Sequence, residues 1–159
     1  MSEAAARDME NYLHRNIPLS AAMGVQVRVA TPEHVLLFAP LAPNINHQQT
    51  VFGGSGAAVA TLSAWSLLHL RLARAGLEAE LVIQRSSMEY ERPITGDFEA
   101  ECRCAGDEEW RRFATLLERR GRARLTLAAR LLQESAAMAA FMGDFVALRG
   151  KVARFTQGP

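Results

Sequence analysis

The chain contains a stretch of 37 residues, from 34 to 70, without a single Asp, Glu, Lys or Arg. Charged residues make up 22% of the whole chain, so an even distribution would place about eight charges in this stretch. Residues 51–70 are long enough to cross a bilayer, but they are rich in Gly, Ala, Ser and Thr and contain His69. The stretch therefore predicts a helix buried on all sides inside a soluble fold, and no contact with a membrane.

This long helix is expected to begin at Gly53 and Gly54, after a loop over 40–50, and to end near Ala75, before Gly76. Its residues are apolar nearly all the way round, which leaves no face to present to water. Other elements therefore have to wrap it.

Apolar patterns predict six strands around this helix, some with apolar residues at every second position and others as nearly continuous apolar runs. Two strands precede the helix and four follow it, at 25–30, 34–39, 81–92, 97–105, 122–132 and 136–148. The strand at 34–39 is nearly all apolar and is expected to be covered on both faces. Shorter helices are expected at 5–16 and 108–120. Since no helix separates each strand from the next, the pattern favours an α+β fold with an antiparallel sheet and excludes a doubly wound parallel sheet.

The charge balance and the cysteines limit the partners and the compartment. The 18 basic and 17 acidic residues leave a net charge of +1, which argues against a nucleic-acid partner. The first residues are polar and acidic, so we expect no signal peptide and a cytoplasmic protein. Cys102 and Cys104 are too close in sequence for an ordinary disulfide and too few for a zinc site, so we expect reduced thiols and no metal.

Several segments resemble hotdog-fold thioesterases, in which a curved antiparallel sheet wraps one long central helix. The segments are 19–24, 88–93 with 96–97, 121–124 and 140–146. The run Asn44-Ile-Asn-His-Gln-Gln-Thr-Val-Phe-Gly-Gly-Ser55 is similar to the thioesterase domain at the C-terminus of YiiD-type proteins. This resemblance covers roughly residues 13–149. It implies a single hotdog domain over residues 1–159, and a homodimer or tetramer with two sites at each dimer interface.

PaaI-type acyl-CoA thioesterases are more distant and have a pattern of polar residues in the same loop and helix. Their pattern is Asn, then Gln-Thr, then His-Gly-Gly, then an Asp seven residues after the second Gly. In this chain the matching residues are Asn46, Gln49-Thr50 and Gly53-Gly54, while Phe52 stands at the His position and Thr61 at the Asp position. The usual catalytic carboxylate is therefore absent.

Thioester hydrolysis requires donors for the developing oxyanion and a positioned water molecule. The first N–H groups of a helix are unpaired and lie at its positive end, so the Gly54 N–H is the expected oxyanion donor. The alternative is that the two glycines only turn the chain into the helix. Asn46 is expected to hold the water, helped by Thr61 or His47. The alternatives are a loop Asn that caps the local backbone, a helix Thr that bonds a carbonyl one turn back, and a solvated loop His.

Other residues are candidates for substrate binding. Those around the start of the helix are Thr50, Phe52, Gly53 and Ser55. Tyr90 is expected to be a core residue or part of the wall of an acyl tunnel, and not a chemical group. Arg122 and Arg124 share one strand face and could pair with the phosphates of coenzyme A, or simply be solvated there.

These residues together predict a thioesterase that acts on an acyl-CoA or an acyl carrier protein. Coenzyme A or phosphopantetheine would enter as part of the substrate, and no separate cofactor is expected. The missing carboxylate favours an alternative, a non-catalytic module that binds or senses acyl thioesters. A hotdog dehydratase would need a His paired with an acid on the helix, and the long helix carries no acid.

Overall fold

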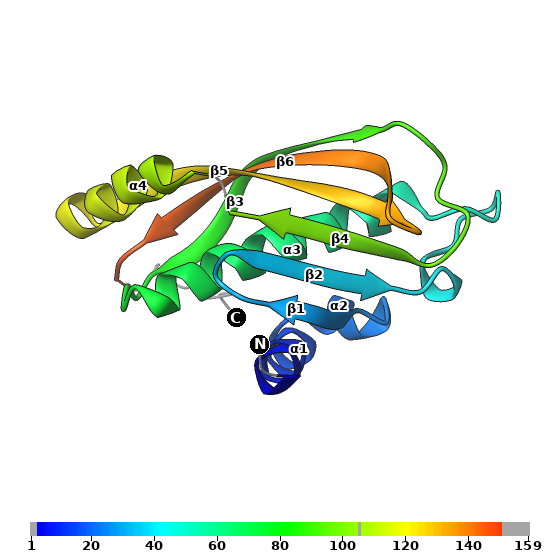
Figure 1. Ribbon diagram of the computed structural model, residues 1–159, viewed down its shortest axis with the longest axis horizontal. Coiled ribbons are helices and arrows are strands. Elements are labelled where there is room, and N and C mark those ends of the chain that lie inside the picture. The colour runs from blue at the N-terminus through cyan, green and yellow to red at the C-terminus, as the bar shows by residue number, and fades with distance from the viewer. Residues whose placement is uncertain (1–2, 105, 151–159) are drawn as a thin grey trace, which may run out of the picture.

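The computed structural model describes residues 3–104 and 106–150. Six antiparallel strands form one sheet in the order β1-β2-β4-β5-β6-β3, and the long helix α3 lies along one face of this sheet (Figure 1). The strands are β1 Gln26–Ala30, β2 His34–Ala39, β3 Glu80–Tyr90, β4 Phe98–Arg103, β5 Arg122–Gln133 and β6 Ala136–Leu148. The helices are α1 Glu3–Asn16, α2 Pro18–Ala22, α3 Gly53–Arg74 and α4 Asp107–Arg120, with a short 3-10 helix η1 at Ala42–Asn44. The predicted fold class is confirmed, and α2 and η1 are additions to it.

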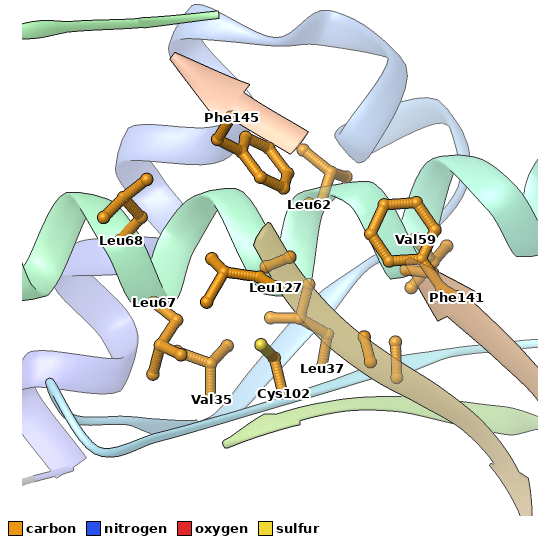
Figure 2. Packing of buried hydrophobic residues seen from close by; sticks show 14 of the residues in the cluster. Val35, Leu37, Val59, Leu62, Leu67, Leu68, Cys102, Leu127, Phe141 and Phe145 are labelled. Carbon is orange, nitrogen blue, oxygen red and sulfur yellow. The ribbon is translucent and has the colours of Figure 1, made fainter. Parts of the chain in front are cut away.

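The helix α3 is the centre of the hydrophobic core. Figure 2 shows Val59, Leu62, Leu67 and Leu68 of α3 among side chains of the strands, namely Val35, Leu37, Cys102, Leu127, Phe141 and Phe145. No residue of α3 between 55 and 72 is fully exposed. The absence of charge over 34–70 makes this enclosure possible, because no ionised group has to leave water. No helix in the described part of the chain is long and apolar enough to cross a membrane.

One face of α3 departs from the expected burial on all sides. The sheet covers one side of the helix, while Gly54, Ala57 and Thr61 lie at helical spacing on a face that stays partly exposed. Further along the same face, Trp65 and His69 are stacked with the Tyr12 ring of α1, with 4.8 Å between the Trp65 and His69 ring centroids. Because α1 reaches only the C-terminal half, an open stripe of Gly54, Ala57 and Thr61 remains.

The two edges of the sheet differ in how they are covered. At the β1 edge, the Glu10 carboxylate of α1 accepts a hydrogen bond of 2.8 Å from the Val27 N–H. The other edge strand, β3, is eleven residues long and pairs only with β6. All of β3 is exposed except Leu81 and Met88, which are partly exposed. The sheet therefore has one covered edge and one open edge.

The strand β2 is not covered on both faces, as its apolar sequence led us to expect. Its burial alternates, with Val35, Leu37 and Ala39 buried against the core and the residues between them partly exposed. The outer face of the sheet has no second layer over β2, so its apolar side chains there remain accessible to water (Figure 1).

Truncating a side chain on the buried face of α3 tests this core. Leu67 is fully buried, so we expect Leu67→Ala to lower the free energy of unfolding by about 2–5 kcal/mol, because a cavity remains. Leu19→Ala is the matched control, because Leu19 is 57% exposed and should change stability by less than about 0.5 kcal/mol. Urea unfolding measures both, and an equal loss in the two variants would contradict the described core.

Candidate functional site

The loop before α3 is built around the side chain of Asn46. Its Oδ1 accepts hydrogen bonds from the N–H groups of Gln48 (2.9 Å) and Thr50 (3.1 Å), and its Nδ2 donates to Thr50 Oγ1 (2.9 Å). Gln49 takes a positive φ of 65° at the tip of the loop. The Asn46 amide is thus used to shape the loop, which matches its alternative role as a cap of the local backbone.

A second asparagine, Asn44, ties this loop to the rest of the fold. Its Nδ2 donates to the carbonyls of Met23 (2.9 Å) and Pro40 (2.8 Å), and its own carbonyl accepts from the Phe52 N–H at 2.8 Å. The side chain is buried, and its Oδ1 has no partner among the described residues. Sequence reasoning missed this residue, because an Asn in a Pro-containing loop resembles any turn residue.

The N-terminus of α3 has no cap. Phe52 holds the N-cap position and makes no capping hydrogen bond, and the first turn contains no acidic residue. The first N–H with a backbone partner is that of Gly56, which donates to the Phe52 carbonyl at 3.1 Å. Within the described part of the chain, nothing accepts from the N–H groups of Gly53, Gly54 and Ser55. These donors and the positive end of the helix dipole are free to hold an anion or an oxyanion.

Two aromatic side chains flank these free donors. The Tyr90 hydroxyl, at the end of β3, donates to the Gly53 carbonyl at 2.6 Å. Burial raises the pKa of Tyr90, so the hydroxyl stays protonated and remains a donor. The Phe52 ring lies over Gly54, where any Cβ would collide with it. Both rings are more than half exposed, so they form an apolar rim beside the helix N-terminus.

The remaining candidates near α3 differ in their contacts. Thr61 Oγ1 donates to the Ala57 carbonyl at 2.8 Å, which is the alternative expected for a helix threonine. This hydroxyl keeps its lone pairs and can still accept a hydrogen bond. His47 is exposed and Ser55 is partly exposed. Neither side chain has a partner in the part of the chain that the structure describes.

The two arginines proposed for coenzyme A phosphates lie elsewhere in the protomer. Arg122 and Arg124 are exposed on β5, opposite in phase to the buried residues of that strand. The far end of β5 carries Leu131, which packs against Gly56 of α3. Seven residues of strand separate Arg124 from Leu131, or about 23 Å. A single protomer therefore does not bring these arginines to the helix N-terminus.

The fold and this loop can be compared with known proteins. Residues 6–149 match the family described as "Putative thioesterase (yiiD_Cterm)". The chain belongs to this family. The match spans the sheet, α3 and the loop before it, so the resemblance drawn from the loop sequence is confirmed.

Solved structures agree with this family. A protein of unknown function from Chlorobaculum tepidum is 27% identical with a TM-score of 0.85, and the match covers 91% of this chain and 94% of that one. A protein from Shewanella oneidensis described as a "putative thioesterase" is 25% identical with a TM-score of 0.82, over 92% and 99% of the two chains. A Pseudomonas aeruginosa protein described as "Probable Thioesterase" is 23% identical with a TM-score of 0.78, over 91% and 96%, and supports the fold alone. The predicted hotdog architecture is thereby confirmed.

The described residues include no group of three or more His, Cys, Asp or Glu side chains placed to hold a metal ion. The polar groups that converge at the start of α3 are backbone N–H groups and hydroxyls. Such groups can donate hydrogen bonds to a neutral or a negatively charged oxygen atom of a ligand.

Two glycines of the first turn allow a test of this geometry. A Cβ at Gly56 would lie 2.9 Å from Leu131 Cδ1 in the core, whereas one at Gly54 would meet only the exposed Phe52 ring. We expect Gly56→Ala to be less stable than Gly54→Ala by about 1–3 kcal/mol, because a buried side chain yields less easily. Urea unfolding of the two variants checks this, and equal stabilities would contradict the packing at Gly56.

Proposed function

We propose that the protein hydrolyses an acyl thioester at the first turn of α3. Membership of the thioesterase family supports this reaction. The observation that carries the proposal is the uncapped helix N-terminus, with the N–H groups of Gly53, Gly54 and Ser55 left unpaired. The rim formed by Phe52 and Tyr90 offers the apolar contact that the thioester and the start of an acyl chain need.

The proposed reaction begins when a water oxygen bonds to the thioester carbonyl carbon. The carbonyl oxygen becomes an oxyanion, and the N–H of Gly54 donates to it from the positive end of α3. The carbon–sulfur bond then breaks, the sulfur takes the proton that the water has lost, and the carboxylic acid remains. The thiol that leaves belongs to coenzyme A or to the phosphopantetheine of a carrier protein.

We assign the activation and positioning of the attacking water to Asn46 and His47 of the loop before α3 and to Thr61 on the open stripe. Asn46 acts mainly by shaping the loop, because its amide already has partners there. His47, which is exposed beside it, is the base that takes the proton, since a neutral imidazole has a ring nitrogen that can accept one. Thr61 orients the water through its free lone pairs. Thr61 lies seven residues beyond Gly54, about 10 Å along the helix, so both cannot serve one carbonyl in a single protomer.

A homodimer resolves this separation. Two copies that pair their β3 edges antiparallel would continue the sheet and bring their open stripes together, with Thr61 of each copy near Gly54 of the other. The open β3 edge supports this arrangement, because an exposed strand of eleven residues is a template for pairing. Val82 and Ile83, which are 45% and 41% exposed, would lie within the interface.

The dimer is tested by placing charge on the open edge. We expect Ile83→Lys combined with Val82→Lys to shift the protein to a monomer, because two lysines would be desolvated beside those of the partner. Leu19→Lys is the control, since Leu19 is exposed but lies far from β3 in the sequence and outside the sheet. Sedimentation velocity measures the mass, and a protein that is monomeric before substitution would overturn the arrangement.

Turnover of acyl thioesters of graded chain length tests the reaction. We expect Gly54→Ala to lower kcat/KM by about tenfold or more, because its methyl group crowds the oxyanion site. Gly106→Ala is the matched control, since Gly106 holds the N-cap position of α4 and a Cβ there would meet nothing within 4 Å. Thiol release by the parent protein, lost only in Gly54→Ala, is the expected result.

A second function, a module that binds acyl thioesters without cleaving them, is favoured by one observation. The hydroxyl at the position of the usual carboxylate is that of Thr61, which donates its hydrogen to Ala57 and cannot remove a proton from water at neutral pH. Tight acyl-CoA binding in calorimetry, without release of thiol, would select this function over hydrolysis.

A further inference from the structure

We propose that unpaired arginines on α4 and β5 dock the acidic surface of an acyl carrier protein, which delivers the thioester to the site. This inference rests on the proposed function and adds the source of the acyl group. The arginine surface consists of Arg119, Arg120, Arg122 and Arg124 around two apolar side chains, Leu116 and Met142.

The arginine surface is hollowed on both sides of Leu116. One groove of about 500 Å³ is lined by Leu116, Arg120, Arg122 and Arg124, and a neighbouring one of about 490 Å³ includes Leu116, Arg124 and Met142. Leu116 is 40% exposed and Met142 is 48% exposed. An apolar centre with arginines around it is the composition of a protein interface.

Across the described part of the chain, the arginines of this surface differ from six other arginines in having no ion-pair partner. Arg7, Arg28, Arg74, Arg103, Arg112 and Arg130 each form an ion pair with a glutamate. Within the described residues, Arg119, Arg120, Arg122 and Arg124 have no such partner. The net charge of the whole chain is only +1, and these four neighbouring arginines form a local excess of positive charge within it. Such a patch steers and orients an acidic partner.

The spacing of the charges fits an acidic helix better than a small phosphate ligand. Leu116 and Arg120 lie four residues apart, so they stand one turn, about 6 Å, apart along α4. Carboxylates on a facing helix recur at the same interval. Arg122 and Arg124 extend the line of arginines from Arg120 along β5. The two grooves beside Leu116 are shallow and open. A single diphosphate would use a compact and enclosed cluster of donors instead.

In the proposed dimer, the register of the sheet would bring this surface near the edge of the neighbouring copy that carries its site. Glu80 of β3 pairs with Leu148 of β6, and Leu148 pairs with Arg122 of β5. In an antiparallel pair of β3 edges, the Glu80 end of one strand lies next to the Tyr90 end of the other. Arg122 is then three strand spacings, about 14 Å along the sheet, from Tyr90 of the second copy. Arg122 lies on the outer face of the sheet, whereas Tyr90 bonds to α3 on the inner face. A flexible phosphopantetheine arm bridges such a gap.

The test compares two substrates that carry the same acyl chain. Octanoyl-CoA and octanoyl-loaded acyl carrier protein are hydrolysed by the parent and by the double variant Arg119→Glu with Arg120→Glu. We expect kcat/KM for the carrier-protein substrate to fall about tenfold or more, through KM, because two attractions become repulsions. Turnover of octanoyl-CoA should stay unchanged, which also shows that the variant is folded. Arg15→Glu reverses an exposed arginine on α1 and should change neither substrate.

Direct binding separates this inference from the proposed function. Calorimetry with holo acyl carrier protein should show binding to the parent and to Arg15→Glu, and a loss of about tenfold or more in the double variant. No binding to the parent, or equal binding to all three proteins, overturns the docking surface whether or not thioesters are hydrolysed. An equal fall in turnover of both substrates, or binding to phosphatidylglycerol vesicles in place of the carrier protein, overturns it too. Failure to release thiol from either substrate overturns only the proposed reaction.

Discussion

The enclosure of α3 by the sheet is the constraint on which the rest of the structure depends. A 22-residue helix with no acidic side chain and with basic residues only at its last turn can be wrapped by strands along most of its length. This burial supplies the apolar area that stabilises the fold. It also holds the first turn of the helix in place, because Gly56 is locked against Leu131 of β5. A first turn held in this way keeps its free N–H groups in a fixed position, which preorganised oxyanion stabilisation would need.

The same enclosure is incomplete, and its gaps coincide with the site. One sheet and one short helix cannot surround α3, so a stripe from Gly54 to Thr61 stays open beside an unpaired edge strand. The opposite edge is covered by α1, where Glu10 occupies a backbone donor of β1. The contrast between the edges argues that β3 is kept free for pairing. A second copy there would cover the apolar part of the stripe and bring Thr61 of one protomer near Gly54 of the other.

Much of the fold could be predicted from patterns along the chain. Alternation of apolar residues marks β4 and β5 well, a largely apolar run marks β6, and the glycines at 53, 54 and 76 bracket α3. The predictions from sequence were wrong or incomplete where the apolar pattern carries no information about which elements pack against a residue. The apolar β2 looks fully covered, yet only one of its faces meets the core. Asn44 looks like a turn residue, and its three hydrogen bonds to distant backbone groups exist only in the folded chain.

The sequence by itself determined the buried helix, the antiparallel sheet and the loop that leads into the helix. These depend on local propensity and periodicity, which each segment carries within it. The tertiary structure decided which of the candidate residues meet. It brought Tyr90 from the end of β3 onto Gly53, while it left Arg124 about 23 Å, and Arg122 about 30 Å, along β5 from the packing of Leu131 on Gly56. The 37 residues without charge predicted a buried helix, but only the arrangement of strands around it showed which face remains open.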